Sequence, residues 1–317
     1  MNKTIHIRWV IAHEPLSLFY RAAKSFAASI NSRSNGQNIE VEIMTLNEYS
    51  DRYNNGVPVS KHDLLGLMDA GKIEMSQMYT TWLAEKYYFD MHVLDLPFIF
   101  RDHAHAKVVL EGEVGEQLLG GLAKRSNVHG LAFTYSGGFR MIPGNKAIRT
   151  VEDFDGVSIR SNKNPFAMET FRAVGAIPVP CELEDINDGV ANGLFMGGES
   201  AWPRVYPLEQ NTFSTVMNDT KHSLFLTSMI VQKRFWVSLG AELRQLVKDA
   251  AVDAAREERI ESIRDGEQAM QKAREEGIEI VELGEGDKQK FVAATQTVYE
   301  KFESYFTPGL IDNIKIH

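Results

Sequence analysis

A long helical stretch near the C-terminal end is the feature that most constrains the fold of this chain. Residues 240–276 are almost all good helix formers, and apolar residues recur on one face with charges of both signs between them. One helix of that length would be roughly 50 Å long, which is more than the width of one domain. We therefore expect a helix that lies across two domains. The alternative is two ordinary helices with a break near Gly266.

Length and composition agree with two globular domains. The chain has 317 residues, too many for one small core, and its 44% hydrophobic and 24% charged residues are typical of a globular protein. A net charge of -9 argues against a general affinity for nucleic acid or anionic membranes. Cys181 is the only cysteine, which excludes an intramolecular disulfide and a thiolate metal cluster. No apolar run reaches the length of about 18 residues that a transmembrane helix needs.

The first part of the chain alternates strands with helices. The β-α-β-α-β order is typical of a right-handed, parallel, doubly wound sheet. The strands expected there are residues 5–10, 39–43 and 73–78, the helices are 16–30 and 60–69, and 47–58 is a polar loop. Further along, we expect strands at 94–100, 128–135, 177–180, 222–231 and 278–283, and helices at 104–124, 183–191 and 287–302.

Arg160 lies where a ligand would be bound in an open α/β sheet. Residues 157–160 alternate apolar and polar after Gly156, which predicts a short strand that ends on Arg160. Asn164 and Pro165 then have the pattern of a helix N-terminus. Five guanidinium donors would thus stand at a strand's C-terminal end beside unpaired helix N–H groups, and both favour an anion. The alternative is a surface arginine in an ordinary ion pair.

Motifs of catalysis and metal binding are incomplete. His103 and His105 resemble a metal pair, but no second cluster lies near them in sequence and they begin a helix, so we expect a structural role. Ser200 lacks the flanking glycines of a nucleophile elbow, and no phosphate-binding or dinucleotide-binding glycine motif occurs. We expect no enzyme and no metal or redox cofactor. The alternative is a two-lobed enzyme acting on a small carboxylate, which a catalytic base with a perturbed pKa would favour.

Six segments in a fixed order carry a family resemblance over nearly the whole chain. They are residues 12–14 (AHE), 65–75 (LGLMDAGKIEM), 94–98 (LDLPF), 136–140 (SGGFR), 150–160 (TVEDFDGVSIR) and 170–180 (TFRAVGAIPVP). Each segment alone is unspecific, but their order is specific. Together they resemble the solute-binding proteins of tripartite ATP-independent periplasmic (TRAP) transporters, dicarboxylate-binding type.

The resemblance implies an α/β, two-lobed periplasmic binding protein fold in which the long helix spans both lobes. Lobe one would comprise residues 1–137 and 224–263, and lobe two 138–223 and 264–317. The implied function is that of a periplasmic solute receptor. It would bind a small organic acid in the cleft between the lobes, close about a hinge, and deliver the acid to the subunits of a TRAP membrane permease. Its contact with membrane proteins would be peripheral, with no nucleic acid partner. A sensor-coupled receptor would share the ligand chemistry.

The resemblance also implies roles for charged residues. Arg160 matches an arginine that makes a two-pronged salt bridge to the ligand's carboxylate, and Arg140 matches an arginine that supports it. Glu14 resembles an acid that some members, ectoine binders among them, point at the polar or cationic part of the ligand. The alternative for Glu14 is an acid at a helix start, because Pro15 follows it.

Further site residues follow from matches and from two departures. Tyr79 and Trp82 match positions on the wall of the first lobe, and Asn164 lies at or beside a polar contact. The family's usual DGQENP is MGGESA at residues 196–201, so the acid is kept as Glu199 but the ligand-facing asparagine is replaced by Ser200. Leu183 stands where an aromatic residue usually caps the ligand. Trp202 and Lys163 are candidates for the vacated roles, with plain packing as the alternative.

Overall fold

The computed structural model describes residues 4–34 and 38–317, and the chain divides into two compact units. The first unit runs to Tyr88 and adds Leu110–Ser136 and Leu226–Glu261. The second unit comprises Phe89–Val109, Gly137–Phe225 and Ser262–His317.

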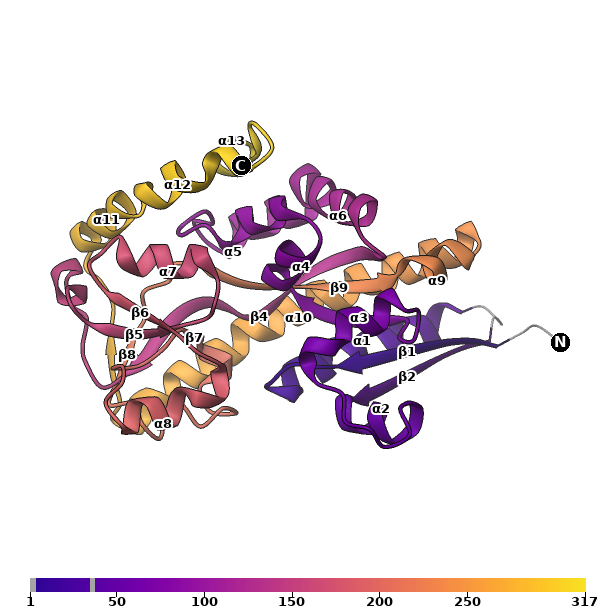
Figure 1. The fold of residues 1–317 in the computed structure, drawn as a ribbon, viewed down its shortest axis with the longest axis horizontal. Coiled ribbons are helices and arrows are strands. Elements are labelled where there is room, and N and C mark those ends of the chain that lie inside the picture. Colours follow the sequence, from indigo (N-terminus) through magenta and orange to yellow (C-terminus); the bar gives the residue numbers. More distant parts are fainter. Residues whose placement is uncertain (1–3, 35–37) are drawn as a thin grey trace. The chain divides into compact units, whose positions relative to one another are not determined.

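Helix α10 (Ala241–Glu275) contributes residues to both units. It runs for 35 residues without interruption, through Gly266 and across the boundary between Glu261 and Ser262 (Figure 1). The prediction of one long helix shared by two domains is therefore confirmed, and the alternative break near Gly266 is wrong.

The sheet of the first unit begins with three parallel strands. Strand β1 (Ile5–Ile11) lies beside β2 (Ile39–Thr45), as Figure 1 shows. It also pairs with β3 (Met75–Tyr79) and is parallel to both neighbours, so the predicted doubly wound start is confirmed. Strand β9 (Leu224–Gln232) then pairs antiparallel with β3 and neighbours β4 (Val128–Gly144).

The core of the first unit packs between this sheet and two helices. Helix α1 (Leu16–Arg33), predicted at 16–30, buries one apolar stripe, because residues three and four apart share one face. That stripe packs with Trp9 of β1, Met229 of β9 and the alanines of the first part of α10. The buried residues of the stripe include Phe19, Ala22, Ala23, Phe26 and Ile30.

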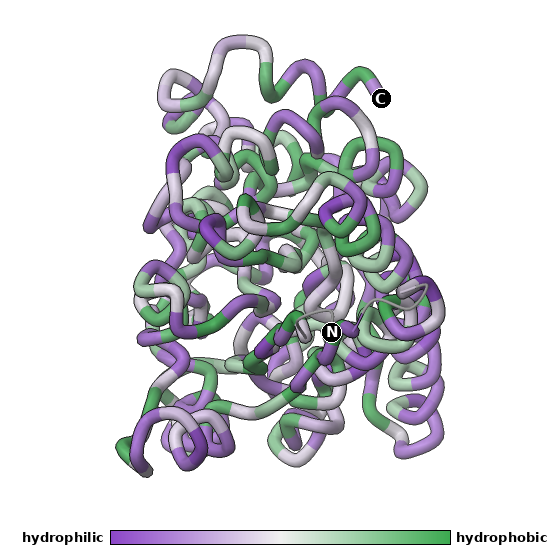
Figure 2. The backbone as a smooth tube through the Cα atoms, turned by 90° about the vertical axis from the view of Figure 1, so that its right-hand side faces the viewer, coloured by the Kyte–Doolittle hydropathy of each residue, from purple (hydrophilic) through white to green (hydrophobic). Residues whose placement is uncertain are grey.

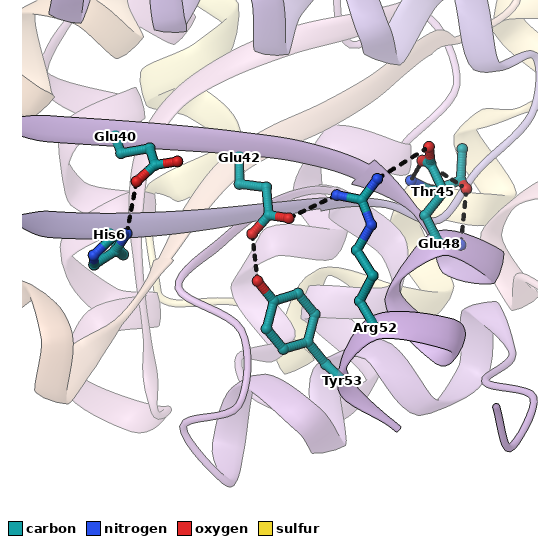
Figure 3. Close-up of polar contacts among 7 residues, drawn as sticks. All are labelled: His6, Glu40, Glu42, Thr45, Glu48, Arg52 and Tyr53. Carbon is teal, nitrogen blue, oxygen red and sulfur yellow. Dashed lines mark hydrogen bonds and ion pairs between the residues drawn. The ribbon is translucent and has the colours of Figure 1, made fainter. Parts of the chain in front are cut away.

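Helix α2 (Leu46–Tyr53) stands where the sequence predicted a loop at 47–58. The prediction missed a capping box: the Glu48 N–H donates to the Thr45 hydroxyl, and the Thr45 N–H donates to the Glu48 carboxylate. Arg52 and Tyr53 then reach Glu42 on β2, as Figure 3 shows. Local capping and these contacts with the strand outweigh the polar composition of the segment.

The second unit contains two small sheets. In the first, β8 (Val216–Asn218) lies between β10 (Glu279–Val281), to which it is parallel, and the C-terminal part of β4, to which it is antiparallel. Strand β7 (Ser200–Ala201) pairs with β4 opposite Arg140 and Met141. The second sheet pairs β5 (Ser158–Ser161) in parallel with β6 (Ile177–Pro180), with α7 (Pro165–Arg172) between them in sequence.

Several predicted elements differ in extent or type. Residues 94–100 form no strand, because the 3-10 helix Phe89–Asp95 occupies the start of that segment. Strand β4 continues past the predicted end at 135, as far as Gly144. The single helix predicted at 104–124 is interrupted at Gly112, whose extended backbone precedes α6, and that at 287–302 is interrupted at Thr295. The remaining helices are α3 (Leu64–Asp69), α4 (Thr80–Lys86), α5 (His103–Glu111), α6 (Glu113–Arg125), α8 (Ile186–Ala191), α9 (Lys233–Ser238), α11 (Glu285–Ala294), α12 (Gln296–Phe302) and α13 (Leu310–Lys315).

One segment lies in a different unit from the one expected. The sequence placed all residues up to 137 in lobe one, but Phe89–Val109 belongs to the second unit. The reason is a set of contacts with the C-terminal helices: the Asp90 carboxylate accepts hydrogen bonds from the Thr307 N–H and hydroxyl, at 3.0 and 2.6 Å. The Tyr299 hydroxyl also donates to the Pro97 carbonyl, at 2.7 Å. None of these distant partners can be read from the local sequence.

Within the part of the chain that the structure describes, no helix is long and apolar enough to cross a membrane. Hydrophobic residues are instead interspersed with hydrophilic ones along the backbone (Figure 2).

Candidate functional site

Arg160 is held rigidly at the end of β5. The residue is 6% exposed, and its Nε–H and one Nη2–H both donate to the Cys181 carbonyl, at 3.0 and 2.8 Å. A guanidinium has five N–H donors, so three stay without a hydrogen-bond partner among the described residues. Strand β5 runs one residue past the predicted end, to Ser161, so Arg160 is its last residue but one. The paired contact with Cys181 fixes the plane of the fork.

Helix α7 begins beside this strand as the sequence predicted. Asn164 is its N-cap: its Oδ1 accepts the Phe166 N–H at 2.9 Å, and Pro165 occupies the first helical position. The Asn164 side-chain NH₂ group has no hydrogen-bond partner in the described part of the chain, although the residue is only 4% exposed. This amide is therefore a second donor close in sequence to Arg160.

Glu199 is a buried carboxylate whose oxygens are occupied by the protein. Oε2 accepts the Ser161 hydroxyl at 3.1 Å, and Oε1 lies 3.2 Å from His222 Nε2 and 3.9 Å from Arg140 Nε. Burial alone would raise the pKa of Glu199, but the Arg140 charge and the His222 hydrogen bond outweigh it and lower the pKa to about 2. The acid therefore stays ionised. Because both carboxylate oxygens already contact protein side chains, Glu199 is placed to position Arg140. A direct contact between Glu199 and a ligand stays a prediction.

Arg140 lies on β4 against an aromatic ring. Its guanidinium carbon is 3.6 Å from the centre of the Phe225 ring, and Arg204 approaches the same ring at 5.1 Å. Burial lowers the pKa of Arg140, while Glu199 and Asp95 act in the opposite direction. Arg204 and Arg160 act on Arg140 as further positive charges, and a cluster of guanidinium groups favours an anion.

Ser200 has a buried hydroxyl that lacks a partner. The residue is 1% exposed, and its Oγ makes no hydrogen bond with any described residue. Buried hydroxyls are nearly always satisfied, so this one is a candidate for contact with a ligand or a water molecule. It follows Glu199, whose N–H donates to the Arg160 carbonyl at 3.2 Å. The structure thus brings Ser200 next to the strand that carries Arg160.

Trp202 and Lys163 both contact other residues of the second unit. The Trp202 indole N–H donates to Asp219 Oδ1 at 3.1 Å, and its ring packs in an apolar cluster with Met141 and Met217. The Lys163 side chain is 66% exposed and forms an ion pair of 2.9 Å with Glu182. Trp202 is therefore packed in the interior and Lys163 lies on the surface, and a ligand contact of either residue stays a prediction. Leu183 likewise packs against a small apolar cluster around Ile186, Val190 and Phe195.

In the first unit, Tyr79 and Trp82 belong to one aromatic cluster. The His13 ring lies 4.2 Å from that of Tyr79 and 5.1 Å from that of Trp82. The His62 ring stacks on Trp82 at 5.0 Å. Sequence reasoning brought Tyr79 and Trp82 forward but missed both histidines. His13 could have been found, because it follows the end of β1 as Tyr79 ends β3, and binding residues gather at such strand ends.

Glu14 has the helix-start role that was weighed as its alternative. The residue is exposed, and its carboxylate accepts the Leu16 N–H, the first of α1, at 2.8 Å. An acid there satisfies one of the unpaired N–H groups of the helix terminus. A contact between Glu14 and a ligand stays a prediction.

The histidine pair at 103 and 105 does not assemble a metal site. His105 Nδ1 accepts the Arg101 N–H at 3.1 Å, and its Nε2 lies 2.8 Å from the Ile314 carbonyl, so this side chain ties α5 to α13. Within residues 4–34 and 38–317, no group of three or more histidine, cysteine or acidic side chains is placed to hold a metal ion.

The lowered pKa of Glu199 predicts a loss of stability in acid. Its pKa falls from 4.5 to about 2 on folding, so the stabilisation is fully present above pH 4.5 and is lost as the pH falls toward 2. A shift of that size corresponds to on the order of 3 kcal/mol. Urea unfolding of Glu199→Gln between pH 2 and 5 should therefore show a shallower pH slope than wild type. Glu300→Gln, at an exposed acid without described contacts, should keep the wild-type slope; equal slopes for Glu199→Gln would contradict the assignment.

Comparison with known proteins finds relatives along most of the chain. The family model of bacterial extracellular solute-binding protein family 7 matches residues 11–305. A solute-binding protein of Chromohalobacter salexigens is 24% identical over 92% of this chain and 82% of its own length. The ectoine-binding periplasmic protein of Halomonas elongata is 31% identical over 55% of this chain. That match spans about half of the relative, 52% of its length.

Solved structures share the fold. A TRAP periplasmic solute-binding protein of Ochrobactrum anthropi superposes with a TM-score of 0.88 at 22% identity, covering 98% of this chain and 94% of its own. One from Pseudomonas putida F1, solved with D-glucuronate, has a TM-score of 0.84 at 24% identity and coverages of 98% and 96%. One from Shewanella oneidensis, solved with succinate, has a TM-score of 0.83 at 19% identity, and the match covers 99% of each chain. The predicted periplasmic binding protein fold is thereby confirmed. Since the family model covers nearly all of it, this chain belongs to bacterial extracellular solute-binding protein family 7, a family of solute receptors and not of enzymes.

Proposed function

We propose that this protein is a periplasmic receptor that binds the carboxylate of a small organic acid through Arg160 and delivers the acid to a TRAP membrane permease. The observation that carries the proposal is the arginine itself. It is almost fully buried, fixed by the Cys181 carbonyl, and keeps three N–H donors without a described partner. A buried cation with spare donors in a fixed plane is suited to a carboxylate, which accepts two parallel hydrogen bonds.

Two further groups extend the carboxylate site. The Asn164 NH₂ group is a donor, and the Ser200 hydroxyl can donate or accept. Main-chain bonds hold their surroundings to β5: the Arg160 N–H donates to the Gly197 carbonyl at 2.9 Å, just before the segment that carries Ser200. An acid with an oxygen on the carbon next to its carboxylate offers acceptors to both groups. We therefore propose hydroxy or keto acids as the preferred ligand class.

The comparisons support an acid as the ligand. The proteins from Pseudomonas putida and Shewanella oneidensis were solved with D-glucuronate and succinate, and both ligands are carboxylates. The periplasm is proposed because relatives such as the C4-dicarboxylate-binding protein of Rhodobacter capsulatus are periplasmic by name. Glu14, Tyr79 and Trp82 of the first unit remain proposed ligand-binding residues, each to be tested by its own variant.

Replacing Arg160 tests the carboxylate contact. A thermal-shift screen of small acids first identifies a ligand, because a compound at about 100 times its dissociation constant adds about 2.7 kcal/mol to stability. Truncating one partner of a buried charge pair costs about 2–5 kcal/mol, so Arg160→Ala should weaken binding of that ligand by more than about thirtyfold in calorimetry. Arg160→Lys should also weaken binding, since an ammonium keeps the charge but cannot form the fork. Arg172→Lys is the matched control, because that exposed arginine of α7 pairs only with Glu169 at 2.6 Å. Wild-type affinity in Arg160→Lys, or no acid that stabilises the protein, would refute the proposal.

Replacing Ser200 tests the second contact. Because its hydroxyl has no described partner, Ser200→Ala should leave the free protein as stable as wild type or slightly more stable. The same variant should weaken the ligand about threefold to tenfold, the usual range for one hydrogen bond. Ser161→Ala is the matched comparison: it removes a hydroxyl that donates to Glu199 at 3.1 Å, so it should destabilise the free protein. A Ser200→Ala variant that binds every acid as wild type does would remove Ser200 from the site.

A further inference from the structure

The second unit holds a cavity that is separate from the carboxylate site. Its volume is about 580 Å³, within the range of small-molecule sites, and neither Arg140 nor Arg160 lines it. Its lining includes Phe139 of β4 and the α10 residues from Ser262 to Met270. Successive side chains of a strand point to opposite faces, so Phe139 faces away from the side of β4 on which Arg140 meets Glu199.

The wall of this cavity is largely aromatic. Phe98, Phe100 and Phe139 line it together with Trp202. The hydrogen bond from the Trp202 indole to Asp219 fixes the orientation of that ring. Rigid aromatic faces favour a flat apolar partner, because stacked or edge-to-face rings attract beyond the burial of their area.

Gly266 keeps one side of the cavity open. Glycine is among the weakest helix formers, yet Gly266 stands in the interior of α10 and lines the cavity. A Cβ at this position would lie 3.6 Å from the Trp202 Cβ, in ordinary contact, and any longer side chain would extend along the aromatic wall. The missing side chain is therefore space that a ligand can occupy.

The charged groups at the cavity favour one anionic group. Two of its acids are already engaged: Asp102 accepts the His105 N–H at 2.7 Å, and Asp219 pairs with Lys221 at 3.0 Å. Lys288 has no described ion pair, and Arg101 uses one N–H for the Lys315 carbonyl at 3.1 Å. Glu267 is the one lining acid without a described partner. The three lining acids thus equal the three lining Lys and Arg side chains in number, but Lys288 and Arg101 keep N–H donors that an anionic group can accept.

We propose that this cavity is a second small-molecule site, which takes a flat aromatic molecule with a single anionic group. The aromatic body would lie against Trp202 and Phe139 beside Gly266, and the anionic group would face Lys288 and Arg101. The site does not depend on the organic-acid site, because it shares neither Arg160 nor Arg140 with it.

The dye 8-anilinonaphthalene-1-sulfonate is a suitable probe for the full chain. Its fluorescence titration should show one saturable site. Gly266→Leu, which fills the cavity, should weaken binding about tenfold or more. Val292→Trp fills the same cavity from α11, so the result does not depend on a single substitution in α10. Gly120→Leu is the matched control, because Gly120 also lies in a helix, with nothing within 4 Å of its Cβ position and no part in the cavity. Dye binding at wild-type strength in both filled variants would overturn the proposal.

The anionic group is tested with a neutral analogue, N-phenyl-1-naphthylamine. Lys288→Gln should weaken binding of the sulfonate dye about twofold to fivefold, which is typical of an exposed ion pair. The same variant should bind the neutral dye as wild type does. Lys290→Gln is the control, since Lys290 also lies on α11 but pairs with Glu152 and Asp287 at 3.1 Å. Equal effects on both dyes would refute the proposed charge preference. Arg160→Lys should bind the sulfonate as wild type does; a loss there would place the dye in the organic-acid site and overturn the proposal.

Discussion

The candidate site depends on one buried carboxylate. Glu199 is 2% exposed, and its carboxylate oxygens contact the Ser161 hydroxyl and the His222 ring. The Arg140 guanidinium forms an ion pair with the same carboxylate. A buried guanidinium without a counter-charge costs several kcal/mol, so Arg140 can be buried because Glu199 lies beside it. Arg160 is different, because its described hydrogen bonds go to a neutral carbonyl. Glu199 acts on Arg160 only through its electrostatic field, and we propose that a ligand carboxylate supplies the direct counter-charge.

Gly197 and Gly198 allow the segment that carries Glu199 to pack closely against β4 and β5. A Cβ on Gly197 would lie 2.1 Å from the Pro143 carbonyl oxygen, and one on Gly198 would lie 3.0 Å from the Arg160 Cβ. No side chain fits at the first position, and at the second the neighbour would have to move. The pair lets residues 197–199 bond through their main chain both to β4 and to β5.

Sequence reasoning succeeded where the signal is local and failed where it depends on distant partners. The alternation at residues 157–160, the Asn164 cap and the periodicity of α10 are set by neighbouring residues, and the structure has all three. The Thr45 and Glu48 capping box was also local but was overlooked. In contrast, the role of Glu199 depends on His222 and Arg140, which no spacing reveals. The continuation of β4 to Gly144 was not predicted, because the glycine pair Gly137 and Gly138 is typical of a turn. In the structure both glycines stand within the strand, with φ of 108° and 89°.

A crystal structure with an acid found by thermal-shift screening tests the central claim most directly. The account predicts a ligand carboxylate whose oxygens lie about 2.7–2.9 Å from Nη atoms of Arg160, the distance of a charge-assisted hydrogen bond. It also predicts that Glu199 still contacts His222 and that Arg160 still donates to the Cys181 carbonyl. A bound acid whose carboxylate is held by other residues, with the three remaining donors of Arg160 turned to solvent, would contradict the account.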